Sequence, residues 1–233
     1  MINSYKYATA WPSYNNLLDW LLSSYGMDSN VTDSHGSRDW TNTNWTWNTT
    51  DYVLGTASWE WDGSWDYITF SNDTLGEWDF MISVWFKTDV VTSQNKVILN
   101  TRDPLNSYAG LQISRTNNII SCALDTWPAY IKIELTQTVS ASTWYHLVYY
   151  RDWDTVGAVL NNGTIETNTW ATWDLSGTSD KYFSRSTNWQ AAYSWDWLID
   201  QPQFWNRAPA TWDIEALYND WNWLAYSEFD SGS

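Results

Sequence analysis

Paired carboxylates are the first residues in this sequence whose types and spacing could do chemistry. Glu60 and Asp62 lie two residues apart, as do Glu77 and Asp79. On a β-strand, residues two positions apart point to the same face. A glycosidase needs two carboxylates flanking the bond that it breaks, so these pairs make a glycoside hydrolase one alternative for this protein.

A second group of residues combines aromatic, amide and charged side chains. Its members, Arg102, Asp103, Asn106, Trp127 and Tyr130, fall on predicted loops that could face one end of a folded domain. A sugar needs a planar aromatic ring to stack on and polar partners at its rim. The group therefore predicts a glycan-binding site, and the alternative is that each member is a plain surface-loop residue.

Oxygen ligands are concentrated in a third place, the segment DSNVTDSHGSRD from Asp28 to Asp39. Hard cations such as calcium take six to eight oxygen ligands. The chain has a net charge of −16 and a pI near 4.1, which also suits cation binding. A solvated acidic surface explains the same composition without any bound cation.

Charge and cysteine content exclude several classes of partner and site. Nucleic acid and anionic membrane partners are excluded because a phosphate-binding surface needs clustered Lys and Arg. Cys122 is the single cysteine, so no intrachain disulfide forms, and its apolar surroundings predict a core position. With only His35 and His146, a Cys/His zinc site is excluded, and His146 is interpreted as a packed, hydrogen-bonded core histidine. The sequence contains no run of 18 apolar residues, so no membrane span is predicted. The first residues, MINSYKYATA, lack a signal-peptide pattern.

The elements that must position these residues are predicted to be β-strands. The segment from Trp144 to Gly163 predicts a hairpin, with strands at 144–150 and 156–160 joined by a polar turn. Large apolar groups alternate on both faces of its first strand, which predicts a central strand between stacked layers. Phe80 to Lys87 is a second strong strand, and APATWDIEALYND, residues 208–220, is the one clear helix.

Together these elements predict a single all-β domain, a two-sheet antiparallel jelly-roll sandwich with one short C-terminal helix. The domain is expected to span residues 18–226. Residues 1–17 are interpreted as an N-terminal arm or linker, and residues 227–233 as a C-terminal tail.

Several stretches resemble one family in the right order. The hairpin TWYHLVYYRD…VLNNGTIE resembles the central hairpin of the LamG-like (laminin G, pentraxin) branch of the concanavalin A-like jelly rolls. EWDGSWDYITF (60–70), DFMISVWFKTD (79–89) and LIDQPQFWNRAPATWDIEALYND (198–220) resemble further elements of that family. The resemblance covers roughly Leu18 to Tyr226 and is specific for the fold but not for the function, because the fold carries lectins, adhesion modules and hydrolases.

The resemblance also implies a cation site and argues against catalysis. Similar domains often hold calcium between the N-terminal loop and a strand near the C-terminus. The implied ligands are Asp28, Asn30, Asp33 and Asp200, with Asp62 and Asp66 as a second cluster. Asp200 has the alternative role of a buried, turn-capping carboxylate. The related glucanases carry Glu-x-Asp-x-x-Glu, and neither carboxylate pair here is followed by the third acid.

The 22 tryptophans occupy unusual positions. Many lie among Asp, Asn, Ser and Thr, where turns favour glycine. The resemblance places glycine at Trp65, Trp78, Trp153, Trp197, Trp221 and Trp223, and an aromatic residue only at Trp61, Trp85, Trp144 and Trp205. We predict that most of the other 18 are UGA codons read as glycine in the source organism, which raises glycine from 10 to 28 residues, about 12% of the chain. The alternative is an aromatic-rich sugar-binding surface.

The sequence as a whole favours a non-catalytic recognition module that binds carbohydrate on a cell surface or host, with calcium as a possible cofactor. The first alternative is a structural or adhesion domain of a phage virion or large surface protein, which contacts a surface protein rather than a glycan. The second alternative is the glycoside hydrolase. The expected location is extracellular, at a cell surface or in a virion.

Overall fold

The computed structural model describes residues 15–28, 30–62, 66–70, 75, 79–102, 110–125, 130–169, 181–183, 196–210 and 212–218. In chain order, their elements are α1 (Asn15–Leu18), β1 (Leu21–Ser24), β2 (Thr41–Thr43), β3 (Thr46–Asn48), β4 (Ser58–Asp62), β5 (Tyr67–Phe70), β6 (Phe80–Thr88), β7 (Lys96–Asn100), β8 (Gly110–Thr116), β9 (Ile119–Asp125), β10 (Tyr130–Thr138), β11 (Trp144–Asp152), β12 (Thr155–Leu160), β13 (Glu166–Thr169), β14 (Lys181–Phe183), β15 (Asp196–Trp205) and α2 (Asp213–Tyr218).

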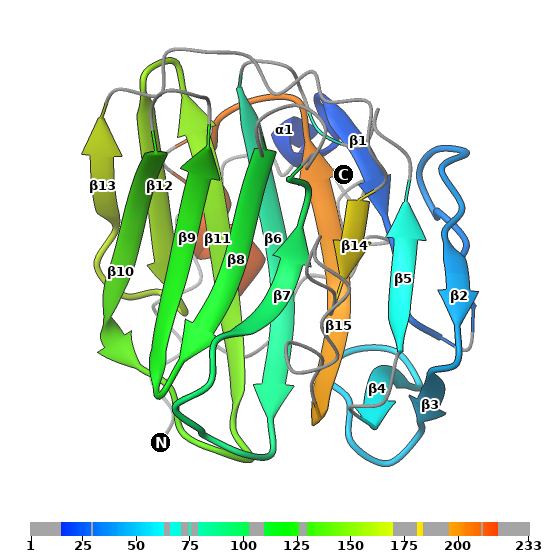
Figure 1. Cartoon of the computed structure of the whole chain (residues 1–233). Coiled ribbons are helices and arrows are strands. Elements are labelled where there is room, and N and C mark those ends of the chain that lie inside the picture. Colours follow the sequence, from blue (N-terminus) through cyan, green and yellow to red (C-terminus); the bar gives the residue numbers. More distant parts are fainter. Residues whose placement is uncertain are drawn as a thin grey trace, which may run out of the picture.

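The strands form two antiparallel sheets stacked face to face (Figure 1). One has the order β13-β12-β11-β6-β15-β4-β3, with β1 also paired to β15, and the other has the order β10-β9-β8-β7-β14-β5-β2. Strands distant in sequence are neighbours in both sheets, which is the crossing connectivity of a jelly roll. The predicted fold class is confirmed.

The hairpin of β11 and β12 is confirmed with its predicted turn. Val148 pairs with Val159 and Asp152 with Thr155, so only two residues connect the strands. β11 also pairs with β6 along eight residues, which places it inside the eight-stranded sheet as the two-faced apolar pattern predicts.

The main core lies between the sheets. It includes Phe80, Ile82, Val84 and Phe86 from one face of β6, and Cys122 from β9, all fully or almost fully buried. Burial raises the pKa of the Cys122 thiol, which stays protonated and packs as a small apolar side chain. The core position predicted for Cys122 is confirmed.

A second apolar layer covers the outer face of the eight-stranded sheet. Val148 and Trp205 from the sheet pack there with Leu17 from α1 and Leu217 from α2. The Trp205 indole N–H also donates to the Leu17 carbonyl at 2.6 Å. Leu17, which the sequence assigned to the N-terminal arm, is therefore buried, and the remaining domain limits stay predictions.

The helix predicted near the C-terminus is present as α2. Its first residue, Asp213, accepts a hydrogen bond from the Ala210 N–H at 2.5 Å and pairs with Arg207. A carboxylate at a helix N-terminus satisfies free N–H groups and complements the helix dipole.

Candidate functional site

The outer face of the seven-stranded sheet differs from that of the eight-stranded sheet because its side chains are mostly polar. Residues that pair across neighbouring strands share one face. One such row crosses the whole sheet and consists of Lys132, Ala123, Gln112, Asn100, Tyr182, Thr69 and Thr41. A parallel row begins with Tyr130, Asp125 and Gly110. Polar and aromatic groups on a sheet face provide the contacts that a polar ligand needs.

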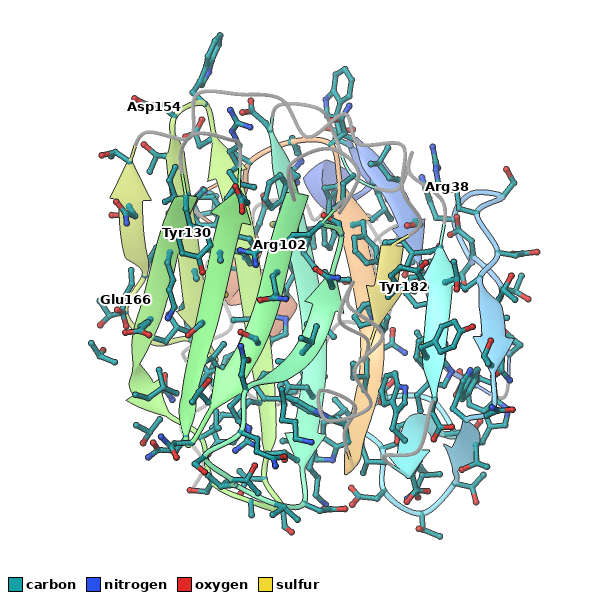
Figure 2. All side chains as sticks on the ribbon, in the orientation of Figure 1. Arg38, Arg102, Tyr130, Asp154, Glu166 and Tyr182 are labelled. Atoms are coloured by element: carbon teal, nitrogen blue, oxygen red, sulfur yellow. The ribbon has the colours of Figure 1, made fainter. Side chains whose placement is uncertain are left out.

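Arg102 and Tyr130 meet on this face, as Figure 2 shows. The guanidinium carbon of Arg102 lies 5.2 Å from the centre of the Tyr130 ring, which is a cation–π contact. Three strand spacings of about 4.8 Å separate β7 from β10, so the two side chains must lean toward each other over β8 and β9. Tyr130 is 55% exposed and Arg102 is half-buried. The arrangement therefore presents a positive charge and an aromatic ring together at the surface.

Gly110 makes the approach of Arg102 possible. Its φ of +137° is a conformation that other residues rarely adopt. A Cβ atom at this position would lie 2.5 Å from the Thr101 carbonyl oxygen and 2.8 Å from the Arg102 Cα. The chain at the end of β7 thus passes closely over Gly110, which brings Arg102 toward β9 and β10.

Asn100 and Asp125 complete the polar surroundings of Arg102. Asn100 is fully buried and its Oδ1 accepts the Arg102 N–H at 3.3 Å. Asp125 is half-buried and pairs with both Tyr130 and Gly110 in the sheet, so its carboxylate lies on the same face. Among the described residues Asp125 forms no ion pair with Arg102, and its oxygens can accept hydrogen bonds from a ligand.

A second aromatic pair lies farther along the same face. The rings of Tyr67 on β5 and Tyr182 on β14 meet edge to face with centroids 5.9 Å apart. Tyr182 of β14 pairs with Asn100 of β7, so the two tyrosines lie on the row of outer-face residues that passes beside Arg102. The labelled side chains of Tyr130, Arg102 and Tyr182 follow one another across the sheet (Figure 2).

The structure brings together two of the five residues predicted to bind a glycan. Arg102 and Tyr130 are in contact, whereas Asp103, Asn106 and Trp127 lie outside the described residues. The sequence reasoning missed Asn100, Gly110 and Asp125. Cys122 and Leu124 share the apolar face of their strand, so the next residue, Asp125, could have been placed on the opposite, outer face.

Two predicted calcium ligands, Asn30 and Asp33, instead hold their own loop. The Oδ1 of Asp33 accepts the N–H groups of Ser24 and His35 at 3.0 Å, and its Oδ2 accepts the Arg38 N–H at 3.2 Å. The Oδ1 of Asn30 accepts the N–H two residues later at 3.0 Å. Carboxylate and amide groups commonly order turns in this way.

Asp28 and Asp200 converge on the loop between β3 and β4. Asp200 Oδ2 accepts the N–H groups of Val53 at 2.8 Å and Leu54 at 3.0 Å, and Asp28 Oδ1 accepts the Thr56 hydroxyl at 3.0 Å. Asp200 is fully buried, and its Oδ1 has no hydrogen-bond partner. Burial raises the pKa of Asp200 to about 8, neighbouring backbone N–H groups oppose this rise, and the charge of Asp28 adds to it. These contacts are those of the turn-capping alternative.

The second predicted cation cluster is described only in part. Asp66 is buried, and the side chain of Asp62 lies outside the described set. Within the described ranges, no three acidic, histidine or cysteine side chains are grouped so that they could hold a metal ion.

One member of each carboxylate pair, Glu60 or Asp79, forms a structural contact. Glu60 Oε2 accepts the Asn48 amide at 3.2 Å on the neighbouring strand. Asp79 Oδ1 accepts the backbone N–H of Trp153 at 2.8 Å and so holds the turn between β11 and β12. Glu77 lies outside the described residues.

His146 is packed and hydrogen-bonded, as predicted. Its Nε2 lies 2.7 Å from the Ser83 Oγ, and its ring stacks on Trp85 with centroids 4.9 Å apart. Burial lowers the pKa of His146 to about 3, so the imidazole is neutral at physiological pH. The neighbouring serine hydroxyl was not expected from the sequence, but both side chains are almost fully buried and face no substrate.

The two stacked sheets define a jelly-roll sandwich, with an apolar layer outside the eight-stranded sheet and mostly polar side chains on the described outer face of the seven-stranded sheet. Residues 62–214 match the family described as the concanavalin A-like lectin/glucanases superfamily. The match spans more than half of the 233 residues, and the protein belongs to this superfamily. Among curated proteins, no sequence matches this chain. In the described part of the chain, no helix is both long and apolar enough to cross a membrane.

Solved structures share the fold at low sequence identity. The chain is similar to the binding domain of Paraclostridial Mosquitocidal Protein 1, with a TM-score of 0.74, 16% identity and coverage of 88% of this chain and 53% of that one. It is also similar to the ligand binding domain of botulinum neurotoxin serotype D in complex with N-acetylneuraminic acid, with a TM-score of 0.72, 14% identity and coverage of 90% and 53%. For the binding domain of serotype G, the TM-score is 0.70 and the identity 13%, with coverage of 86% and 51%. The chain thus spans about half the length of these structures, and the likeness shows a common fold.

Proposed function

We propose that this protein is a non-catalytic module that binds carbohydrate on a cell surface or host, and that its binding site is the sheet face at Arg102 and Tyr130. The observation that carries the proposal is the Arg102 guanidinium 5.2 Å from the centre of the exposed Tyr130 ring. The ring offers an apolar platform, Arg102 offers donors, and Asp125 offers acceptors, which together suit a sugar. The similar structures are described as binding domains, and one contains N-acetylneuraminic acid.

The other functions favoured by the sequence have weaker support. A glycoside hydrolase needs two carboxylates about 5 to 9.5 Å apart on either side of a bond, but the described contacts of Glu60 and Asp79 are structural. A virion or adhesion domain that contacts a protein would be expected to expose a contiguous apolar patch, whereas the described side chains on the outer face of the seven-stranded sheet are mostly polar. For a carbohydrate-binding module, the corresponding location is extracellular, at a cell surface or on a virion.

The proposed site predicts that Tyr130→Ala weakens glycan binding about tenfold or more, because the stacking platform is lost. A glycan array identifies a ligand for the purified chain, and calorimetric titration of that ligand measures the change. Tyr52→Ala is the matched control: Tyr52 is also exposed, but it adjoins Asp51, which contacts Lys87 and Trp144 on the other sheet. The proposed site would be contradicted if both substitutions weakened binding equally, or if neither substitution weakened it.

We also propose that calcium supports the fold between Asp28 and Asp200, which both contact the loop between β3 and β4. The buried Asp200 Oδ1 lacks a partner, and the nearby Asp28 charge disfavours ionisation of Asp200, so a cation between them would relieve both. Only these two of the four implied ligands are suitably placed. Backbone carbonyls and water would have to complete the six to eight oxygens that calcium takes.

The calcium proposal predicts that adding calcium to chelator-treated protein raises the thermal midpoint, because a ligand that binds only the folded state stabilises it. Asp200→Asn should remove this increase while keeping an oxygen for the Val53 and Leu54 N–H groups. Asp33→Asn is the control, because Asp33 is occupied in a different loop. An unchanged midpoint in the unsubstituted protein would overturn the proposal.

A further inference from the structure

The site at Arg102 has hydrogen-bond donors without acceptors. The Nε and Nη2 atoms of Arg102 are shielded from solvent and have no hydrogen-bond partner. The Nδ2 of Asn100, which is fully buried two residues earlier, also has none. These nitrogens can only donate, so they require acceptor atoms that the described residues around them do not supply.

The two arginine nitrogens form one edge of the planar guanidinium, where their N–H bonds point in the same direction. This fork matches the two oxygens of a carboxylate and gives two parallel, charge-assisted hydrogen bonds. An unpaired buried donor costs free energy, and the cost is larger when the donor is charged. An anion with two coplanar oxygens therefore satisfies this edge better than a single hydroxyl group.

The surroundings of Arg102 determine how such an anion is recognised. The Tyr130 ring contacts the guanidinium but supplies no acceptor for the N–H groups of its Nε–Nη2 edge. Lys132, farther along the outer face of β10, is paired with Glu134. Asp125 adds a negative charge to the same face, and the net charge of the chain is −16. Long-range attraction therefore does not draw an anion here, and direct contacts with Arg102 must select it.

We propose that the ligand of this site is an acidic sugar whose carboxylate binds the Nε–Nη2 edge of Arg102. Because this edge is shielded from solvent, the exposed Tyr130 ring must move aside to admit the carboxylate and then stacks on the sugar ring. Asn100 Nδ2 donates a further hydrogen bond. Asp125 accepts hydroxyl groups of the same sugar. This inference rests on the proposed function and adds the chemical class of the ligand.

The test compares acidic glycans with neutral glycans of the same core, such as sialyllactose with lactose, by calorimetric titration of the whole chain. We expect the acidic member to bind about 10- to 100-fold more tightly, the value of charge-assisted hydrogen bonds. Arg102→Lys keeps the charge but loses the fork, so this preference should largely disappear. Asp125→Asn removes a repelling charge and one hydroxyl acceptor, so it should increase the ratio of acidic to neutral affinity.

Arg38→Lys is the matched control, because Arg38 is a half-buried arginine far from Arg102 (Figure 2) and donates to the Leu22 carbonyl. Circular dichroism checks that each variant is folded, and Arg102→Gln provides a second substitution if the lysine variant is not. Equal binding of acidic and neutral sugars, lost in Tyr130→Ala, would overturn the acidic ligand but leave the glycan site intact. Tighter binding of a sulfated sugar would overturn the carboxylate. No binding to any array glycan would overturn both proposals.

Discussion

At the scale of the residue, Trp153 is the clearest conflict between a side chain and its backbone. It lies in the two-residue turn between β11 and β12 with a φ of 54°, and its side chain is 76% exposed. Trp20 is similar, with a φ of 64° and 68% exposure. A bulky residue pays about 1–2 kcal/mol for a left-handed conformation that glycine adopts freely. Glycine would suit the backbone better than tryptophan at these two positions, and the recoding hypothesis stays a prediction.

Replacing Trp153 by glycine is predicted to raise the free energy of unfolding by about 0.5–1 kcal/mol. The gain from relieving the left-handed conformation exceeds the extra entropy that glycine gives the unfolded chain. Both hydrogen bonds of the residue use its backbone, since its N–H donates to Asp79 and its carbonyl accepts from Arg151. The glycine variant keeps both bonds. Urea denaturation of the two proteins measures the difference.

Trp205→Gly is the contrasting substitution, because Trp205 is fully buried and its indole N–H donates to Leu17. Its loss should cost about 3–5 kcal/mol or more, as for other large buried aromatics. A destabilised Trp153→Gly variant would contradict the argument from backbone geometry. The coding DNA tests the origin of the residue separately: UGA at Trp153 and Trp197 would support recoding, and UGG at both would end the hypothesis.

At the scale of the element, the strands could be predicted because each carries a local pattern. The alternation in β6 places Phe80, Ile82 and Val84 in the core, and the polar turn after β11 defines the hairpin. The order of strands in the sheets could not be derived in the same way. Tyr182 of β14 pairs with Asn100 of β7 and Thr69 of β5, and no local signal in either segment determines such long-range partners.

The candidate site, too, could be predicted from the sequence only in part, because it depends on contacts between the ends of distant strands. Arg102 and Tyr130 could be singled out because their chemical types suit a sugar, although they are distant in sequence. Gly110 and Asn100 could not, because their roles depend on how closely the end of β7 passes over β8. The calcium site stays a prediction, and the sequence could not show that Asp28 and Asp33 order separate loops.

At the scale of the whole molecule, two effects of acidification oppose each other. The chain has 27 acidic and 11 basic residues, so lowering the pH from 7 first reduces repulsion among surface charges. His146 acts in the other direction. Its pKa is about 3 in the folded protein and about 6.5 when exposed, so the unfolded state binds the extra proton between these values. The stabilising contribution is complete above about pH 6.5 and is lost as the pH falls toward 3.

The loss attributable to His146 is predicted to be about 1.4 kcal/mol per pH unit, and about 5 kcal/mol over the whole window. Asp200 opposes this loss, because its pKa of about 8 in the folded protein lies above its usual value and acidification toward pH 4 therefore stabilises the folded state. The His146 effect must be isolated by comparison with a variant in which only this residue is changed. His146→Gln keeps a polar partner for Ser83 but cannot titrate. Urea denaturation at pH 7, 6, 5 and 4 should therefore show the variant gaining on the unsubstituted protein at each step, whatever its stability at pH 7. A difference that stays constant with pH would mean that the imidazole can take up a proton in the folded state, and that the layer of Trp85 and Tyr218 around it opens to solvent.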